Sequence, residues 1–182
     1  MIDPFVELSR DRRYDWRTDG KGRLAPAGCT TQLGEGIPMD ERIEISIEIS
    51  APIDRVWRAL TDFREFGQWF RVELEGPFVP GQPLSGIMVY PGQEGVRWHA
   101  VIKRIKPYQF IFCWPHGDGT SEADDVMTHV EFSLQSQNGG TRATVVETGF
   151  EDLPDALRHK AFEQNFEGWT VQIQNLKDYA EG

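Results

Sequence analysis

Residues 49–70 read ISAPIDRVWRALTDFREFGQWF, and the order of elements in this stretch decides the fold class. Pro52 favours the first turn of a helix, because the N–H that proline lacks would be unpaired at that position anyway. Apolar residues at 56, 57 and 60 then recur at helical spacing. A second short helix is predicted over 62–70, with its apolar side formed by Phe63, Phe66, Trp69 and Phe70.

The segments on either side of these helices have the pattern of strands. Residues 42–50, RIEISIEIS, place isoleucine at every second position, which predicts a strand with one buried face. Downstream, turn signals separate five further strand-like segments, at 84–90, 95–105, 109–114, 126–135 and 142–148. Strands that follow one another at this spacing without helices between them predict an antiparallel sheet.

The last segment, 154–181, has the pattern of a long amphipathic helix. Its apolar residues are spaced 4, 3, 4, 3 and 4 apart, at Phe162, Phe166, Trp169, Ile173, Leu176 and Ala180. An apolar stripe and the apolar face of a sheet are both stabilised by burial, so we expect the helix to lie across the sheet. The predicted class is α+β.

Composition and charge narrow the possible functions. The 182 residues carry 29 acids against 19 Lys and Arg, a formal net charge of −10, which disfavours nucleic acid as a partner. No apolar run approaches the roughly 20 residues that span a bilayer, and the N-terminus lacks an apolar signal core. These features predict a cytoplasmic protein that does not associate with membranes. The two cysteines, Cys29 and Cys113, are expected to be unpaired thiols.

Residues 1–38 differ from the remainder in charge and pattern. They hold six acids and six bases, and residues 20–38 are rich in Gly, Pro and Thr without helical or strand periodicity. We therefore predict a weakly structured N-terminal extension over 1–38 and one folded domain over 39–182.

Several quoted motifs, in the same order, resemble a known superfamily. The stretch 49–70 resembles the opening of the START-like helix-grip proteins, also called SRPBCC proteins, and within them the domain of the activator of heat-shock-protein-90 ATPase homologue type. Three later motifs agree in order: VIKRIKPYQFIFCW (101–114), THVEFSLQ with GGTRATVVETGFEDLP (128–154), and GWTVQIQNLKDY (168–179). The resemblance covers about 140 residues, from Met39 to the end.

The resemblance implies a curved antiparallel sheet that grips the C-terminal helix and encloses an apolar cavity. The function it favours is binding of a small hydrophobic, aromatic or lipid-like molecule, without catalysis or cofactor. Two alternatives stay open, namely a metal-free cyclase or aromatase-like enzyme and a cochaperone-like interaction module. The heat-shock activator has a separate N-terminal domain that engages the chaperone, and 38 residues cannot supply one, so we expect no chaperone activation. A homodimer is compatible with the sequence.

The predicted cavity would be bordered by residues from several segments, namely Trp69, Trp98, Trp114, Glu147, Trp169 and Ile173. For Phe166 we expect ordinary core packing. Glu147 shares its strand alternation with Ala143 and Val145, which predicts an inward carboxylate. It would be a hydrogen-bond acceptor for the ligand or a general base with raised pKa, or else an acid that reaches solvent at the strand end.

The four histidines lack the spacing of metal ligands, so no metal site is predicted. His129 is expected to face outward. His99 either reaches the cavity, where it would be the second acid–base candidate, or is a surface or hydrogen-bonded structural residue. The segment 116–125 is acidic but lacks the order of a calcium loop, which predicts a solvated turn.

Overall fold

The computed structural model describes residues 42–116 and 126–182, so the predicted N-terminal extension lies outside the described residues. Its elements are β1 (Arg42–Ile49), α1 (Ile53–Thr61), α2 (Phe63–Phe70), β2 (Val72–Leu74), β3 (Pro83–Met88), β4 (Arg97–Lys106), β5 (Gln109–Pro115), β6 (Met127–Gln137), β7 (Gly140–Thr148), the 3-10 turn η3 (Phe150–Asp152) and α3 (Asp155–Glu181).

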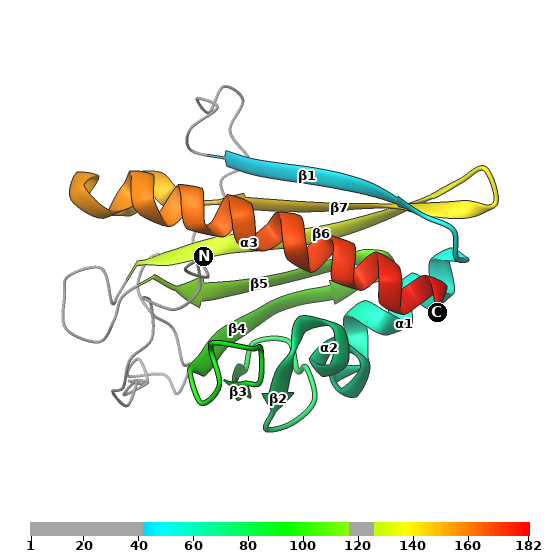
Figure 1. Cartoon of the computed structure of the whole chain (residues 1–182), viewed down its shortest axis with the longest axis horizontal. Helices are drawn as coiled ribbons and strands as arrows, with labels where there is room; N and C mark the ends of the chain where they lie inside the picture. Colours follow the sequence, from blue (N-terminus) through cyan, green and yellow to red (C-terminus); the bar gives the residue numbers. More distant parts are fainter. Residues whose placement is uncertain (1–41, 117–125) are drawn as a thin grey trace.

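The strands form one antiparallel sheet in the order β1-β7-β6-β5-β4-β3-β2 (Figure 1). Strand β1 pairs with β7, so the first and the last described strand lie side by side, with β1 at one edge of the sheet. The register between β4 and β5 shifts between Ile102 and Arg104, which marks a local irregularity of the β-bulge kind. Strand β2 was not predicted, because three residues are too few to show a period of two.

Local chemistry explains why the helical stretch divides in two. The Asp62 side chain accepts hydrogen bonds from the backbone N–H groups of Arg64 and Glu65, so it ends α1 and caps α2. Helix α2 ends at Arg71, whose φ of 63° is left-handed. The break turns the chain so that Phe66, Trp69 and Phe70 are buried against the sheet.

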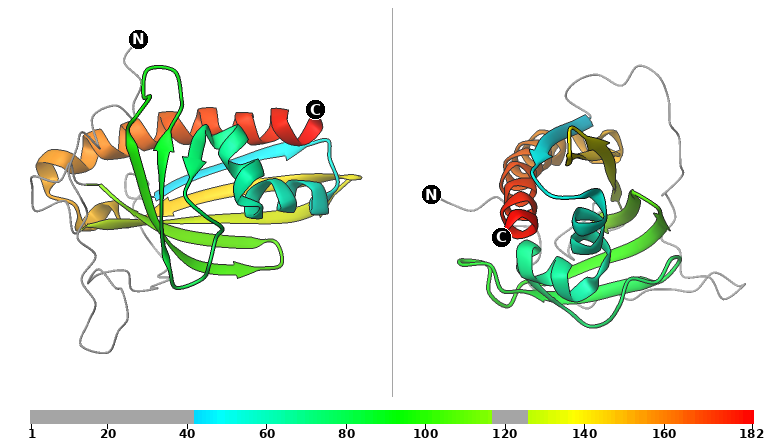
Figure 2. Two further views of the ribbon diagram at one scale, coloured as in Figure 1. Left: turned by 90° about the horizontal axis from the view of Figure 1, so that it is seen from below. Right: turned by 90° about the vertical axis from the view of Figure 1, so that its right-hand side faces the viewer.

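The sheet curves around the helices. Figure 2 shows α3 along one side of the sheet, with α1 and α2 beside it inside the same curve. Helix α3 contacts β1, β7, α1 and α2. This arrangement is the helix-grip fold that the sequence predicts, with a long C-terminal helix across a curved antiparallel sheet.

The buried side of α3 differs from the predicted stripe at one position. Phe166, expected in the core, is 47% exposed, whereas the neighbouring Asn165 is 1% exposed. Adjacent helical residues point about 100° apart, and at this position Asn165 rather than Phe166 is turned toward the sheet. The polar side chain of Asn165 therefore takes the buried position that was predicted for the phenylalanine ring.

No helix within 42–116 and 126–182 is long and apolar enough to cross a membrane.

The expectation of unpaired thiols can be compared with the structure for one of the two cysteines. Cys29 lies outside the described residues. Cys113 is not a free thiol, so the expectation is wrong for Cys113.

Candidate functional site

The carboxylate of Glu147 lies in the core between the sheet and α3. Alternation along β7 places Ala143, Val145 and Glu147 on the inner face, and all three are fully buried. The prediction of an inward carboxylate is confirmed. The alternative, an acid that reaches solvent at the strand end, is wrong.

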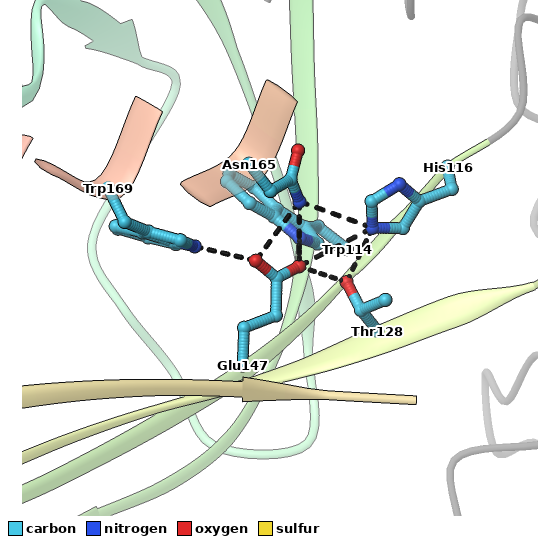
Figure 3. Close-up of polar contacts among 6 residues, drawn as sticks. All are labelled: Trp114, His116, Thr128, Glu147, Asn165 and Trp169. Atoms are coloured by element: carbon cyan, nitrogen blue, oxygen red, sulfur yellow. Dashed lines mark hydrogen bonds and ion pairs between the residues drawn. The ribbon is translucent and has the colours of Figure 1, made fainter. Parts of the chain in front are cut away.

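Three residues on β5 and α3 donate hydrogen bonds to this carboxylate (Figure 3). The indole N–H of Trp114 donates to Oε1 at 2.7 Å, and that of Trp169 donates to Oε2 at 2.6 Å. The amide of Asn165 donates to both oxygens, at 2.9 and 3.0 Å. The contact explains why Asn165 rather than Phe166 faces inward, since the amide ties α3 to the sheet.

Two further donors approach Oε1 from the sheet side. The hydroxyl of Thr128, on β6, donates to Oε1. The imidazole Nε2 of His116 lies 3.4 Å from the same oxygen and 2.7 Å from the Thr128 hydroxyl. His116 and Thr128 are both buried.

These donors decide the protonation of Glu147. Burial opposes the charged form and is the largest single influence, but the hydrogen bond and charge of His116, with hydrogen bonds from Thr128 and Trp114, outweigh it. The pKa of Glu147 therefore lies below its ordinary value, contrary to the raised pKa expected of a general base. Since five side chains already donate to its two oxygens, the carboxylate is fully engaged within the protein.

The four predicted pocket tryptophans surround one phenylalanine ring. The centroid of Phe70 lies 5.6 Å from Trp69, 6.1 Å from Trp98, 6.4 Å from Trp114 and 6.2 Å from Trp169. The structure thus brings the four tryptophans together in one aromatic core. The presence of an open cavity among them stays a prediction.

Hydrogen bonding separates these tryptophans into two kinds. Trp69 donates to the carbonyl oxygen of Ala59 at 2.9 Å, and Trp114 and Trp169 donate to Glu147. The rings of Trp114 and Trp169 also stack, 5.2 Å apart. Trp98 differs, because its indole N–H is buried and has no partner.

Ile173 completes the predicted set of lining residues. It lies on α3, is 2% exposed, and belongs to the same core as the tryptophans. Its presence shows that the apolar side of α3 continues beyond Trp169 toward the C-terminus.

His99 faces away from this core. On β4, Trp98, Ala100 and Ile102 take the inner side, and His99 points to the opposite face, where it lies 2.9 Å from the Ser85 hydroxyl. Burial, followed by the charge of Arg97, lowers its pKa, and the charge of Glu75 offsets this in part. The structure therefore does not place His99 with Glu147 as an acid–base pair.

The surroundings of His129 and the possible metal ligands are the last features to compare with the sequence predictions. His129 lies near Cys113, with its Nδ1 3.5 Å from the Sγ atom. Burial is the main reason that the pKa of His129 is lowered. Among the described residues, no three His, Cys, Asp or Glu side chains gather to hold a metal ion.

Three members of the site were missed from the sequence, namely His116, Thr128 and Asn165. His116 extends the alternation of Phe112 and Trp114 by one step, beyond the predicted end of its strand, and the segment it begins was assigned to a turn. Thr128 lies inside the predicted strand 126–135 and shares its alternation with the buried Val130 and Phe132, which was the available signal for its inward position. Asn165 lies one helical turn before Trp169, which was the available signal for its orientation.

Fold and site together define a START-like helix-grip, or SRPBCC, domain with a buried polar cluster under its C-terminal helix. The chain belongs to the family described as activator of Hsp90 ATPase homolog 1-like protein, whose model matches residues 50–181. No curated protein matches the sequence closely enough to serve as a relative.

Solved structures agree on the fold at low sequence identity. Protein MLL2253 from Mesorhizobium loti is 20% identical with a TM-score of 0.64, over 76% of this chain and 95% of that one. The Aha1 dimer from Colwellia psychrerythraea is 21% identical with a TM-score of 0.58, over 77% and 96%. CalU16 from Micromonospora echinospora is 20% identical with a TM-score of 0.55, over 76% and 75%.

Proposed function

We propose that this domain binds a small, mainly apolar molecule with an aromatic ring, between α2, α3 and the inner face of β4 and β5. The family fold supports the proposal, because the sheet and the long helix enclose a common core lined with aromatic side chains. The engaged carboxylate of Glu147 and the outward position of His99 do not favour the enzymatic alternative.

One observation carries the proposal: the buried indole N–H of Trp98 has no hydrogen-bond partner. An unmade hydrogen bond of this kind costs about 1–3 kcal/mol. The ring is surrounded by other aromatic side chains, with Phe112, Phe70 and Phe66 at 6.0, 6.1 and 6.3 Å. A ligand with an aromatic ring and an acceptor oxygen would pack against these rings and satisfy the donor.

The test is a fluorescence titration with 2-methoxynaphthalene, an apolar ring with one acceptor oxygen. We expect saturable binding to the full chain. Trp98→Phe, which keeps a ring but removes the N–H, should weaken it about two- to tenfold. The matched control is Trp57→Phe, at a partly buried position on α1 where the ring packs edge-on against Tyr108. Absence of saturable binding to the wild-type protein contradicts the proposal.

A chaperone partner is a second candidate, favoured by the family to which the chain belongs and by the exposed ring of Phe166 on α3. Its test is ATPase turnover of the host's Hsp90-type chaperone with and without this protein. A several-fold stimulation that Phe166→Ala reduces would favour this function over ligand binding as the primary one. Since the Colwellia neighbour is a dimer, the same samples should be checked for dimerisation by light scattering.

A further inference from the structure

Strand β1 is at the edge of the sheet that the described strands form, and alternate residues of β1 direct their backbone groups outward from it. The carbonyl of Ile49 points to β7, since its oxygen lies 2.5 Å from the place where a Cβ on Gly140 would stand. Successive carbonyls of a strand point in opposite directions, so that of Glu48 points to the outer edge, where Nζ of Lys177 donates to it at 2.7 Å. The backbone groups of the other even-numbered residues of β1 therefore face the outer edge as well.

The strand is long and regular enough to pair with another strand. It has eight residues and contains no proline, and its register with β7 runs without a shift from Arg42 to Ile49. The side chains at its even-numbered positions, Arg42, Glu44, Ser46 and Glu48, are exposed. A straight edge of this length is a template for a further strand.

An exposed aromatic ring lies beside the same edge. Phe166 and Lys177 are 11 residues apart on α3, which is three turns and about 20°, so both lie on the side of the helix toward the outer edge. Helix α3 and β1 run in the same direction (Figure 1), because Lys177 contacts Glu48 and Glu181 accepts a hydrogen bond from the N–H of Ser50. Eleven helical residues span about 16 Å, or about five strand residues, which places the 47% exposed ring of Phe166 beside the first half of β1.

The charges along β1 are self-complementary in one antiparallel register. Backbone hydrogen bonds require the even-numbered residues of one copy to oppose even-numbered residues of the other. A pairing centred on Ile45 places Arg42 opposite Glu48 twice, by symmetry, and Glu44 opposite the neutral Ser46. A pairing centred on Glu44 opposes that residue to its own copy, and one centred on Ser46 opposes Glu44 to Glu48. Both set like charges against each other, and centres nearer either end pair a shorter length of strand.

We propose that two copies of this chain pair through β1, antiparallel about a two-fold axis at Ile45, so that their sheets join into one. The inner faces of the two strands then meet, and Ile45 and Ile47, which are half-buried in one chain, become covered. Phe166 of each copy adds apolar area on the helix side of this seam. The inference concerns a surface outside the aromatic core and does not depend on the proposed ligand.

The experiment is sedimentation equilibrium of the full chain, at about 0.15 M salt so that repulsion between two chains of net charge −10 is screened beyond about 8 Å. We expect a reversible equilibrium between monomer and dimer. Arg42→Glu and Glu48→Arg each turn both ion pairs into like-charge pairs, so each should weaken the dimer about ten- to a hundredfold. Both positions are exposed, so neither substitution should unfold the chain. The matched control Arg64→Glu makes the same change of net charge as Arg42→Glu at an exposed position on α2 and should leave the dissociation constant unchanged.

A mixture of the two charge variants gives the sharpest comparison. In a mixed pair, positions 42 and 48 are acidic in one chain and basic in the other, so both cross-strand pairs again join opposite charges. We expect the mixture to form a heterodimer under conditions in which each variant alone is monomeric. A wild-type chain that is monomeric at up to about 0.5 mM overturns the inference. Charge variants that dimerise as tightly as the wild type, or a mixture that does not dimerise, overturn it as well.

Hydrogen exchange tests the strand pairing without any substitution. Dilution from dimer to monomer should speed exchange at the N–H groups of Glu44 and Ser46, which face the outer edge, and should change that of Ile45, which faces β7, much less. Exchange at Glu44 and Ser46 that is the same in dimer and monomer overturns the pairing through β1.

Discussion

Replacing Glu147 by glutamine should destabilise the domain by about 2–4 kcal/mol at pH 7. The substitution preserves the shape of the side chain but turns one acceptor oxygen into a donor. If the amide nitrogen replaces Oε2, it faces the indole N–H of Trp169, which now donates at 2.6 Å. One buried donor then loses its acceptor, at about 1–3 kcal/mol, and the remaining hydrogen bonds lose the contribution of the charge.

Urea denaturation measures this loss directly, and a thermal melt should show a decrease of roughly 6–12 °C for a domain of this size. The matched control is Glu73→Gln, at an exposed position on β2, which should change the free energy of unfolding by less than about 0.5 kcal/mol. A Glu147→Gln variant as stable as the control would refute the account of this carboxylate as the centre of a hydrogen-bonded cluster.

The pH dependence gives an independent check of the same reasoning. Because the pKa of Glu147 is lowered in the folded state, its ionised form contributes stability above the ordinary pKa of a glutamate, and this contribution is lost as pH falls toward the folded value. The difference in stability between wild type and Glu147→Gln should therefore shrink as pH falls below about 4.5. A difference that stays constant down to pH 3 would contradict the lowered pKa.

The remaining predictions concern packing and the domain boundary. Gly67→Ala should cost about 1–3 kcal/mol in urea denaturation, because its Cβ would stand 2.5 Å from the carbonyl oxygen of Val72, and a stabilised variant would contradict this. Phe166→Ala should lower the free energy of unfolding by less than about 1 kcal/mol, because Phe166 is 47% exposed. Trp169→Phe should lower it by more than Phe166→Ala does, because Trp169 is fully buried. The reverse order would contradict the exposed position of Phe166. A chain that begins at Met39 should melt within about 5 °C of the full chain, and a larger decrease would mean that residues 1–38 contribute to folding.

The sequence was most informative where a periodic pattern ran over many residues. Alternating isoleucines identified β1, and strand parity placed Glu147 inside the sheet. Parity failed to include His116 because that residue lies just beyond the end of β5, where alternation was no longer applied. Which side chains of a strand face inward follows from the alternation within that one segment, and for Glu147 this alternation was sufficient.

Interactions between distant segments were beyond the reach of these patterns. Hydrophobicity favoured Phe166 for the buried side of α3, but the neighbouring Asn165 takes that place because its amide meets a carboxylate 18 residues away in sequence. The lowered pKa of Glu147 likewise depends on donors from β5, β6 and α3 converging at one point. No single segment contains that information.

The central claim, that an aromatic ligand binds at the inner face beside Trp98, is tested most directly by NMR of nitrogen-15-labelled tryptophan indoles during titration with 2-methoxynaphthalene. The Trp98 N–H signal should shift downfield and saturate, because this buried donor gains an acceptor. The indole signals of Trp69, Trp114 and Trp169 should move less, since their hydrogen bonds are already made within the protein. A Trp98 signal that does not move at probe saturation, or that moves no more than these three, would contradict the claim.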